Sequence, residues 1–106
     1  KNKDSFQIGY INYPKGHEIL KHYHPRRKKI IYDNNEALFI KKGKIRINFF
    51  DPKNMKKSFC SKILNKNDII LILYGGHGFD VINNVEMLEI KQGPYYPKSN
   101  KIKFIK

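Results

Sequence analysis

The sequence predicts an all-β protein, and three observations lead to this prediction. No segment keeps apolar residues at the i, i+3, i+4, i+7 spacing of an amphipathic helix. β-branched and aromatic residues are abundant, with seven Tyr and seven Phe, and these residue types favour strands. Clusters of Gly, Pro, Asn and Asp recur at short intervals, as expected between short strands. The 106 residues suffice for a single domain with a modest core.

Strand-like runs occur in eight places along the chain. We predict strands at residues 6–13, 18–24, 36–41, 44–50, 58–64, 68–74, 78–82 and 86–92. Lys42-Gly43 predicts a tight hairpin, and further turns are predicted at residues 51–54, 65–68 and 83–84. Eight short strands indicate a small β-barrel or jelly-roll sandwich with its core at residues 6–92. Residues 25–35 are expected to form an exposed loop at the rim, and residues 93–106 a C-terminal arm.

Alternation along the strands predicts which side chains face the interior. Because successive side chains point to opposite faces, His22 and His24 share one face. The run 69–73 is apolar on both faces, which suits a buried strand or the face of a homodimer, and we expect a homodimer. The same alternation predicts a core that contains Leu38, Ile40, Ile45, Ile47 and Ile72.

The net charge of +13 raises the possibility of nucleic-acid binding. The lysines are spread along the whole chain, and there are only three arginines, Arg26, Arg27 and Arg46. We therefore expect no nucleic-acid partner, although such a surface attracts anionic small molecules. Cys60 is the single cysteine and cannot form an internal disulfide, which favours the cytoplasm. No apolar run approaches the ~20 residues of a membrane helix, so no membrane partner is expected.

Three histidines and one glutamate are the candidate residues for a metal-binding or catalytic site. His22 and His24 are predicted to point to one side of a strand, as two metal ligands must. Glu36 stands among apolar residues, where a carboxylate must be hydrogen-bonded, paired or metal-bound. His77 follows Gly75-Gly76, where the backbone can turn sharply. Imidazole and carboxylate ligands suit a divalent transition metal such as Mn, Fe, Co, Ni or Zn.

The spacing of these residues resembles the two motifs of the cupin superfamily, specifically its small single-domain, RmlC-like members. Gly16 is followed by five residues and His22-x-His24, and the spacing from Glu36 to Gly43 also matches the first motif. Eleven residues separate His24 from Glu36, so the motif is interrupted by an insertion. The second motif is degenerate, and its histidine, His77, arrives one residue early. The resemblance implies a cupin barrel with a metal ion bound by His22, His24, Glu36 and His77.

The segment 87–95, Met-Leu-Glu-Ile-Lys-Gln-Gly-Pro-Tyr, is similar to the ending of WbuC-type cupin-fold metalloproteins from surface-polysaccharide gene clusters. This resemblance implies a sugar or nucleotide sugar as substrate and isomerase- or epimerase-like chemistry. In such an enzyme, His22, His24 and Tyr74 are the catalytic candidates. Two alternatives stay open: a sugar-binding or sensing cupin without catalysis, and a metal-free ketoisomerase that uses the paired histidines as acid and base.

Arg26, Arg46 and Tyr95 are candidates for substrate binding. Arg26 lies in a run of four basic residues, 26–29, which suits a phosphate group. Arg46 either binds an anionic substrate or lies on the outer face beside Lys44, and we favour the outer face. Ordinary packing with a hydrated hydroxyl is the competing interpretation of Tyr74 and Tyr95.

Overall fold

The computed structural model describes residues 3–96 and 101–103. The chain divides into two units, Lys1–Tyr32 and Asp33–Lys106. The prediction of an all-β protein is confirmed, because the described residues form a four-stranded antiparallel sheet and no helix. The sheet lies in the second unit and contains β1 (Glu36–Phe50), β2 (Cys60–Leu64), β3 (Ile69–Ile72) and β4 (Gly76–Lys91). The described part of the chain contains no helix with the length and apolar character that crossing a membrane would require.

β1 and β4 are two long strands that pair with each other along their whole length. The sequence predicted a hairpin at Lys42-Gly43 and a turn at residues 83–84, and both predictions are wrong. The two sites lie opposite each other in the ladder, where the register shifts three times between Ile40 and Ile45. Turn-forming residues on neighbouring strands therefore produce one shared bend, while the hydrogen-bond ladder continues on both sides of it.

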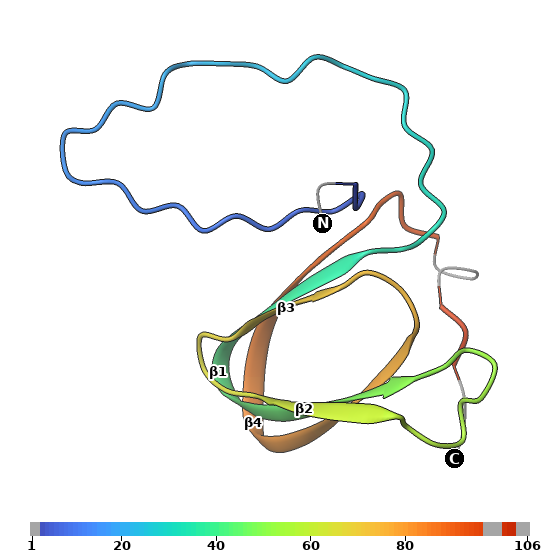
Figure 1. The fold of residues 1–106 in the computed structure, drawn as a ribbon. Coiled ribbons are helices and arrows are strands. Elements are labelled where there is room, and N and C mark those ends of the chain that lie inside the picture. Colours follow the sequence, from blue (N-terminus) through green and yellow to red (C-terminus); the bar gives the residue numbers. More distant parts are fainter. Residues whose placement is uncertain (1–2, 97–100, 104–106) are drawn as a thin grey trace. The chain divides into compact units, whose positions relative to one another are not determined.

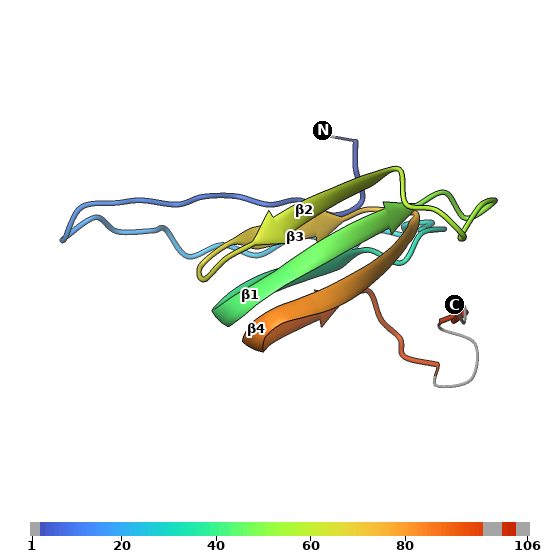
Figure 2. The ribbon, with the colours of Figure 1, turned by 90° about the horizontal axis from the view of Figure 1, so that it is seen from below.

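The bend folds the sheet into two layers (Figure 1). The first layer contains β3, residues 36–40 of β1 and residues 87–91 of β4. The second layer contains β2, residues 45–50 of β1 and residues 76–81 of β4, and Figure 2 shows β2, β1 and β4 side by side. All five predicted core residues are buried. The core consists of Leu38, Ile40, Ile45, Ile47, Leu64 and Ile72.

The turn between β2 and β3 holds the bend in place. Asn67 adopts a φ of 72°, a left-handed conformation that Asn tolerates well. The Asp68 carboxylate accepts a hydrogen bond of 2.7 Å from the Asn65 amide. The Asn67 amide donates to the Ile40 carbonyl at 2.7 Å, so the turn is attached to β1 next to its bend. The predicted turns at residues 51–54 and 65–68 are thus confirmed, the first by an Asn54 amide to Asp51 carbonyl bond of 2.8 Å.

The strands predicted at residues 6–13 and 18–24 are absent from the first unit. Among the described residues, no strand pairing includes a residue before Glu36. β-propensity does not create a strand without a ladder partner, because the backbone N–H and C=O groups then bond to water instead. The loop predicted at residues 25–35 is exposed up to residue 34, whereas Asn35 is buried. The described parts of the predicted C-terminal arm, 93–96 and 101–103, contain no strand or helix.

Candidate functional site

The bend in β1 and β4 brings Glu36 and His77 together. Glu36 begins β1, whereas His77 pairs with Phe49 near the other end of that strand. Thirteen residues of straight strand would separate the two positions by about 43 Å at ~3.3 Å per residue. Instead, His77 Nε2 lies 3.1 Å from Glu36 Oε2. The pair therefore joins the open ends of the two layers, at the opposite end of the core from the bend.

Glu36 and His77 are partly buried, with 17% and 24% of their side chains exposed. The hydrogen bond from His77 lowers the pKa of Glu36, against the opposing effect of burial. The same bond raises the pKa of His77, again against burial. Both shifts favour the charged pair, a carboxylate bonded to an imidazolium.

The second ring nitrogen of His77 lacks a proper partner. Nδ1 is buried and makes no hydrogen bond to any described residue. The Gly75 carbonyl lies close enough to help raise the pKa of the imidazole, but its geometry falls short of a hydrogen bond. A buried polar atom without a partner costs about 1–3 kcal/mol, so the ring is held here by its bond to Glu36 rather than by a complete set of partners.

Two lysines influence the charge of the Glu36 carboxylate. Lys91 pairs with Glu36 in the β1–β4 register, and Lys91 and Lys101 both lower the pKa of Glu36. The Lys91 Nζ lies 3.2 Å from Glu89 Oε1 and 4.9 Å from the centre of the Tyr95 ring. Tyr95, a predicted substrate-binding residue, thus contacts Lys91, the strand neighbour of Glu36.

Asn35 is a residue of this site that sequence reasoning missed. Its side chain is 2% exposed, and Nδ2 donates a 2.6 Å hydrogen bond to the Leu73 carbonyl. Its own carbonyl accepts a 2.9 Å bond from the Gln92 amide. Asn35 thus ties the start of β1 to the segment before His77 and to the end of β4. An Asn in a polar loop gives no sequence signal for such a role.

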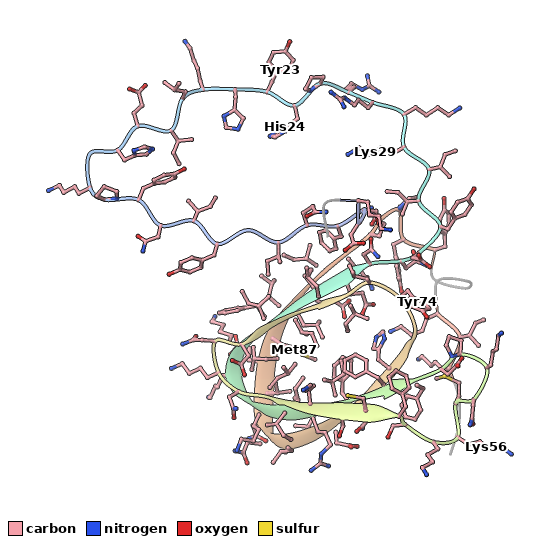
Figure 3. All side chains as sticks on the ribbon, viewed as in Figure 1. Tyr23, His24, Lys29, Lys56, Tyr74 and Met87 are labelled. Atoms are coloured by element: carbon pink, nitrogen blue, oxygen red, sulfur yellow. The ribbon has the colours of Figure 1, made fainter. Side chains whose placement is uncertain are left out.

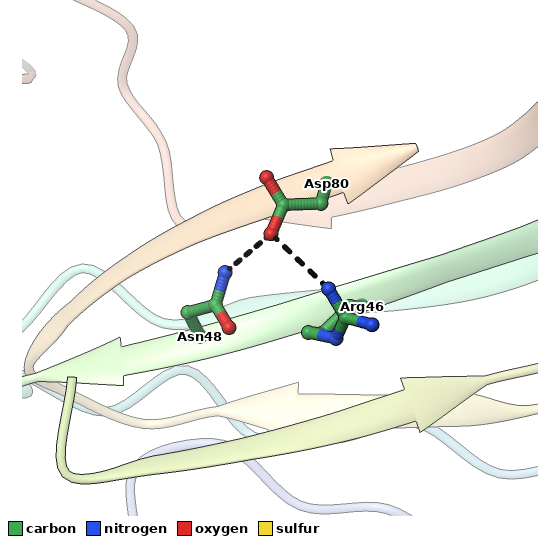
Figure 4. Close-up of polar contacts among 3 residues, drawn as sticks. All are labelled: Arg46, Asn48 and Asp80. Atoms are coloured by element: carbon green, nitrogen blue, oxygen red, sulfur yellow. Dashed lines mark hydrogen bonds and ion pairs between the residues drawn. The ribbon is translucent and has the colours of Figure 1, made fainter. Parts of the chain in front are cut away.

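Arg46 and Tyr74 are two other predicted site residues. Arg46 is on the outer face of the second layer, as favoured from the sequence, because its neighbours Ile45 and Ile47 are buried in the core. The Arg46 guanidinium lies 3.8 Å from the Asp80 carboxylate, which also accepts a 3.0 Å hydrogen bond from Asn48 (Figure 4). Tyr74 follows β3 and is 75% exposed (Figure 3).

The remaining predicted ligands, His22 and His24, belong to the first unit. Their rings lie beside each other, with centroids 5.3 Å apart and an edge-to-face arrangement. His22 Nδ1 lies 2.8 Å from the Leu20 carbonyl. Because a carbonyl can only accept, this contact places a proton on Nδ1, so Nε2 is the nitrogen that could bind a metal ion in the neutral ring. Arg26 is exposed in the same unit.

The Nε2–Oε2 distance of the Glu36–His77 ion pair can be compared with the spacing of two ligands of one metal ion. Ligand atoms at ~2.1 Å from one ion lie about 3.0 Å apart at a right angle and about 3.4 Å apart in a tetrahedron. The 3.1 Å between Nε2 and Oε2 falls in this range. Within either unit, the described residues bring no three His, Cys, Asp or Glu side chains together around an ion-sized space. The four-ligand site therefore stays a prediction. No family model, curated protein or solved structure matches this chain.

Proposed function

We propose that the protein is a metal-binding, cupin-type protein that acts on a small polar substrate, a sugar or nucleotide sugar, in the cytoplasm. The observation that carries the proposal is the inward-facing Glu36–His77 pair at 3.1 Å. In this proposal, His22 and His24 supply the other two ligands that the cupin motif implies. The closed barrel or jelly roll that the cupin resemblance implies is part of this proposal.

The chemistry of the proposed site follows from its donor atoms and charges. A bound divalent ion would act there as a Lewis acid on a carbonyl or hydroxyl oxygen. Glu36 raises the pKa of His77 above its ordinary value, so an ion that binds His77 would have to displace a proton from the ring. Lys91 and Lys101 make the surroundings of the pair favourable for an anionic group such as a phosphate. These features suit isomerase- or epimerase-like chemistry on a nucleotide sugar.

A second candidate function is acid–base catalysis without a metal. The observation that favours it is the hydrogen bond between Glu36 and His77, which already forms an acid–base dyad with a raised histidine pKa. A carboxylate bonded to an imidazole is a common arrangement for moving a proton. In this alternative the barrel and the sugar substrate are kept. A non-catalytic sugar-binding protein would use the same inward-facing groups for recognition.

Metal binding tests the proposal directly. The protein is purified without chelator or immobilised nickel, its metal content is measured, and Mn²⁺ and Ni²⁺ are titrated calorimetrically. We expect one ion per chain, and we expect Glu36→Gln, His77→Ala and His22→Ala each to weaken binding by more than about a hundredfold. Loss of a direct ligand costs at least as much as loss of the groups that orient one.

His17→Ala is the matched control for these variants. His17 is an exposed histidine of the same segment as His22, stacks on Tyr13 with ring centroids 4.0 Å apart, and lies outside the motif. Its replacement is expected to leave metal affinity unchanged. Absence of metal binding in the wild-type protein, or equal losses in His17→Ala and His77→Ala, would overturn the metal site and favour the metal-free alternative.

A further inference from the structure

Asn35 stands at the point where both ladders of β1 in the first layer end. The pairing of β1 with β3 and its pairing with β4 both end at Glu36. One residue earlier, the Asn35 side chain donates a 2.6 Å hydrogen bond to the Leu73 carbonyl, and the Asn35 backbone carbonyl accepts a 2.9 Å bond from the Gln92 amide. Asn35 therefore extends the bonding on both sides of β1 by one position, directly before Glu36.

Leu73 is the residue at which the chain leaves the first layer. β3 ends one residue before it, and residues 73–75 lead to β4 in the second layer. Gly75 has a φ of +102°, a left-handed conformation that glycine adopts without strain, and the next residue is again a glycine. A connection with two adjacent glycines has many accessible conformations. The covalent chain alone therefore does not fix the position of His77 relative to Glu36.

The far end of this connection is held in the second layer. His77 pairs with β1 there. Gly76 lies so close to Met55 that an added Cβ would stand 2.5 Å from the Met55 sulfur. These contacts place His77 within the second layer, whereas Glu36 belongs to the first. The distance between the two side chains therefore also depends on a fixed point beside Glu36.

We propose that Asn35 is this fixed point, a positioning residue that holds Glu36 and His77 at the distance their joint function requires. Its side chain is 2% exposed, so water does not readily replace its bond to the Leu73 carbonyl. Asn35 acts through the strand ends that carry the pair. Its effect on the pair itself needs no metal ion, whereas the consequence for metal binding rests on the proposed function.

The energetic coupling between Glu36 and His77 tests the proposal without a metal. Glu36→Gln, His77→Gln and the double variant are unfolded in urea at mildly acidic pH with chelator present, and the double-mutant cycle gives the coupling. We expect at least about tenfold in the unfolding equilibrium constant for the wild-type background. In the Asn35→Ala background we expect less than about twofold, which is the usual error of additivity. A residue with a structural role alone would lower the stability of every variant and leave the coupling unchanged.

Asn48→Ala is the matched control for Asn35→Ala. Asn48 is an asparagine of β1 that donates a 3.0 Å hydrogen bond to Asp80 on β4, on the outer face of the second layer (Figure 4). Its replacement removes a comparable bond between the same two strands and is expected to leave the coupling unchanged. If circular dichroism shows that Asn35→Ala does not fold, Asn35→Ser takes its place, because its shorter side chain also loses the bond but keeps a polar group at the buried position.

Calorimetric titration with Mn²⁺ measures the consequence for the proposed metal site. Asn35→Ala is expected to weaken binding by about tenfold or more, as loss of a group that orients a ligand does, and Asn48→Ala is expected to leave it unchanged. A wild-type protein that binds no ion would count against the metal site alone, and the coupling would then decide the role of Asn35.

Three results would overturn the positioning role of Asn35. The first is a coupling between Glu36 and His77 that is absent from the wild-type background or equally strong in the Asn35→Ala background. The second is a coupling that falls to the same extent with Asn48→Ala. The third is a wild-type protein that binds Mn²⁺ and an Asn35→Ala variant that binds it equally well.

Discussion

Glu36 and His77 stabilise each other by a charged hydrogen bond whose strength depends on pH. The pKa of Glu36 is lowered, so its contribution is present above the ordinary value of 4.5 and is lost as the pH falls through the lowered value. The pKa of His77 is raised, so its contribution is complete below the ordinary value of 6.5 and is lost as the pH rises through the raised value. The pair therefore stabilises the fold most between pH 4.5 and 6.5.

Glu36→Gln is expected to reduce the free energy of unfolding most within this window and least at alkaline pH. Urea unfolding of both proteins across the pH range, with chelator present, measures the difference. Glu86→Gln serves as the control, because Glu86 forms an exposed ion pair with Lys41 and is expected to give a small, nearly pH-independent change. A difference between wild type and Glu36→Gln that stays constant from acid to alkaline pH would contradict the charged pair.

Single residues of the site differed in how far the sequence could predict them. Glu36 is conspicuous as a carboxylate within an apolar strand, and alternation from Leu38 and Ile40 correctly gives it an inward direction. Its contact with His77 depends on the bend of two strands, which no local pattern specifies. Asn35 was missed altogether, because its burial results from bonds to Leu73 and Gln92, both remote in sequence.

Gly43 determines the shape of the longest ladder in the molecule. Its φ is +90°, a left-handed conformation that other residues adopt at a cost. A Cβ at this position would lie 2.0 Å from the Asn84 carbonyl oxygen on β4. The sequence Lys42-Gly43 was interpreted as a hairpin because glycine is favoured both in tight turns and in strand bends of this kind. Only the continuous pairing with β4 on both sides of Gly43 distinguishes the bend from a reversal of the chain.

Gly43→Ala is therefore expected to destabilise the protein by about 2–4 kcal/mol, from backbone strain and the clash with β4. Equilibrium unfolding in urea measures the loss. Gly78→Ala is the matched control within β4, because its added Cβ would meet only Phe50 Cε2 at the ordinary distance of 3.8 Å and its φ is not left-handed. We expect that substitution to change stability by less than about 0.5 kcal/mol. Similar effects at both positions would show that the bend does not depend on Gly43.

At the scale of the whole molecule, the sequence predicted the all-β class and most of the buried residues better than the number of strands. The alternation that places Leu38 and Ile40 inward shifts by one residue before Ile45 and Ile47, and this shift coincides with the bend. Periodicity thus predicted five of the six core residues and missed Leu64. Residues 6–24 have a similar strand-like composition but pair with no other strand among the described residues. Composition did not predict this, because strand pairing depends on which segments the folded chain brings together.

The division into two units predicts how the folded protein responds to trypsin. Arg26, Arg27, Lys28 and Lys29 are consecutive, exposed and outside any strand. Lys42, Lys44 and Arg46 lie within β1, where cleavage requires the ladder to open first. We expect the first cuts at residues 26–29. A fragment that contains all four strands should then persist and keep its β-type circular dichroism, and mass spectrometry over time measures its formation. Chymotrypsin is the control for sequence preference and is expected to cut at the exposed Tyr23 and Tyr32 before Phe39 or Phe49. First cuts by either protease within β1 would contradict the sheet as the stable unit of the molecule.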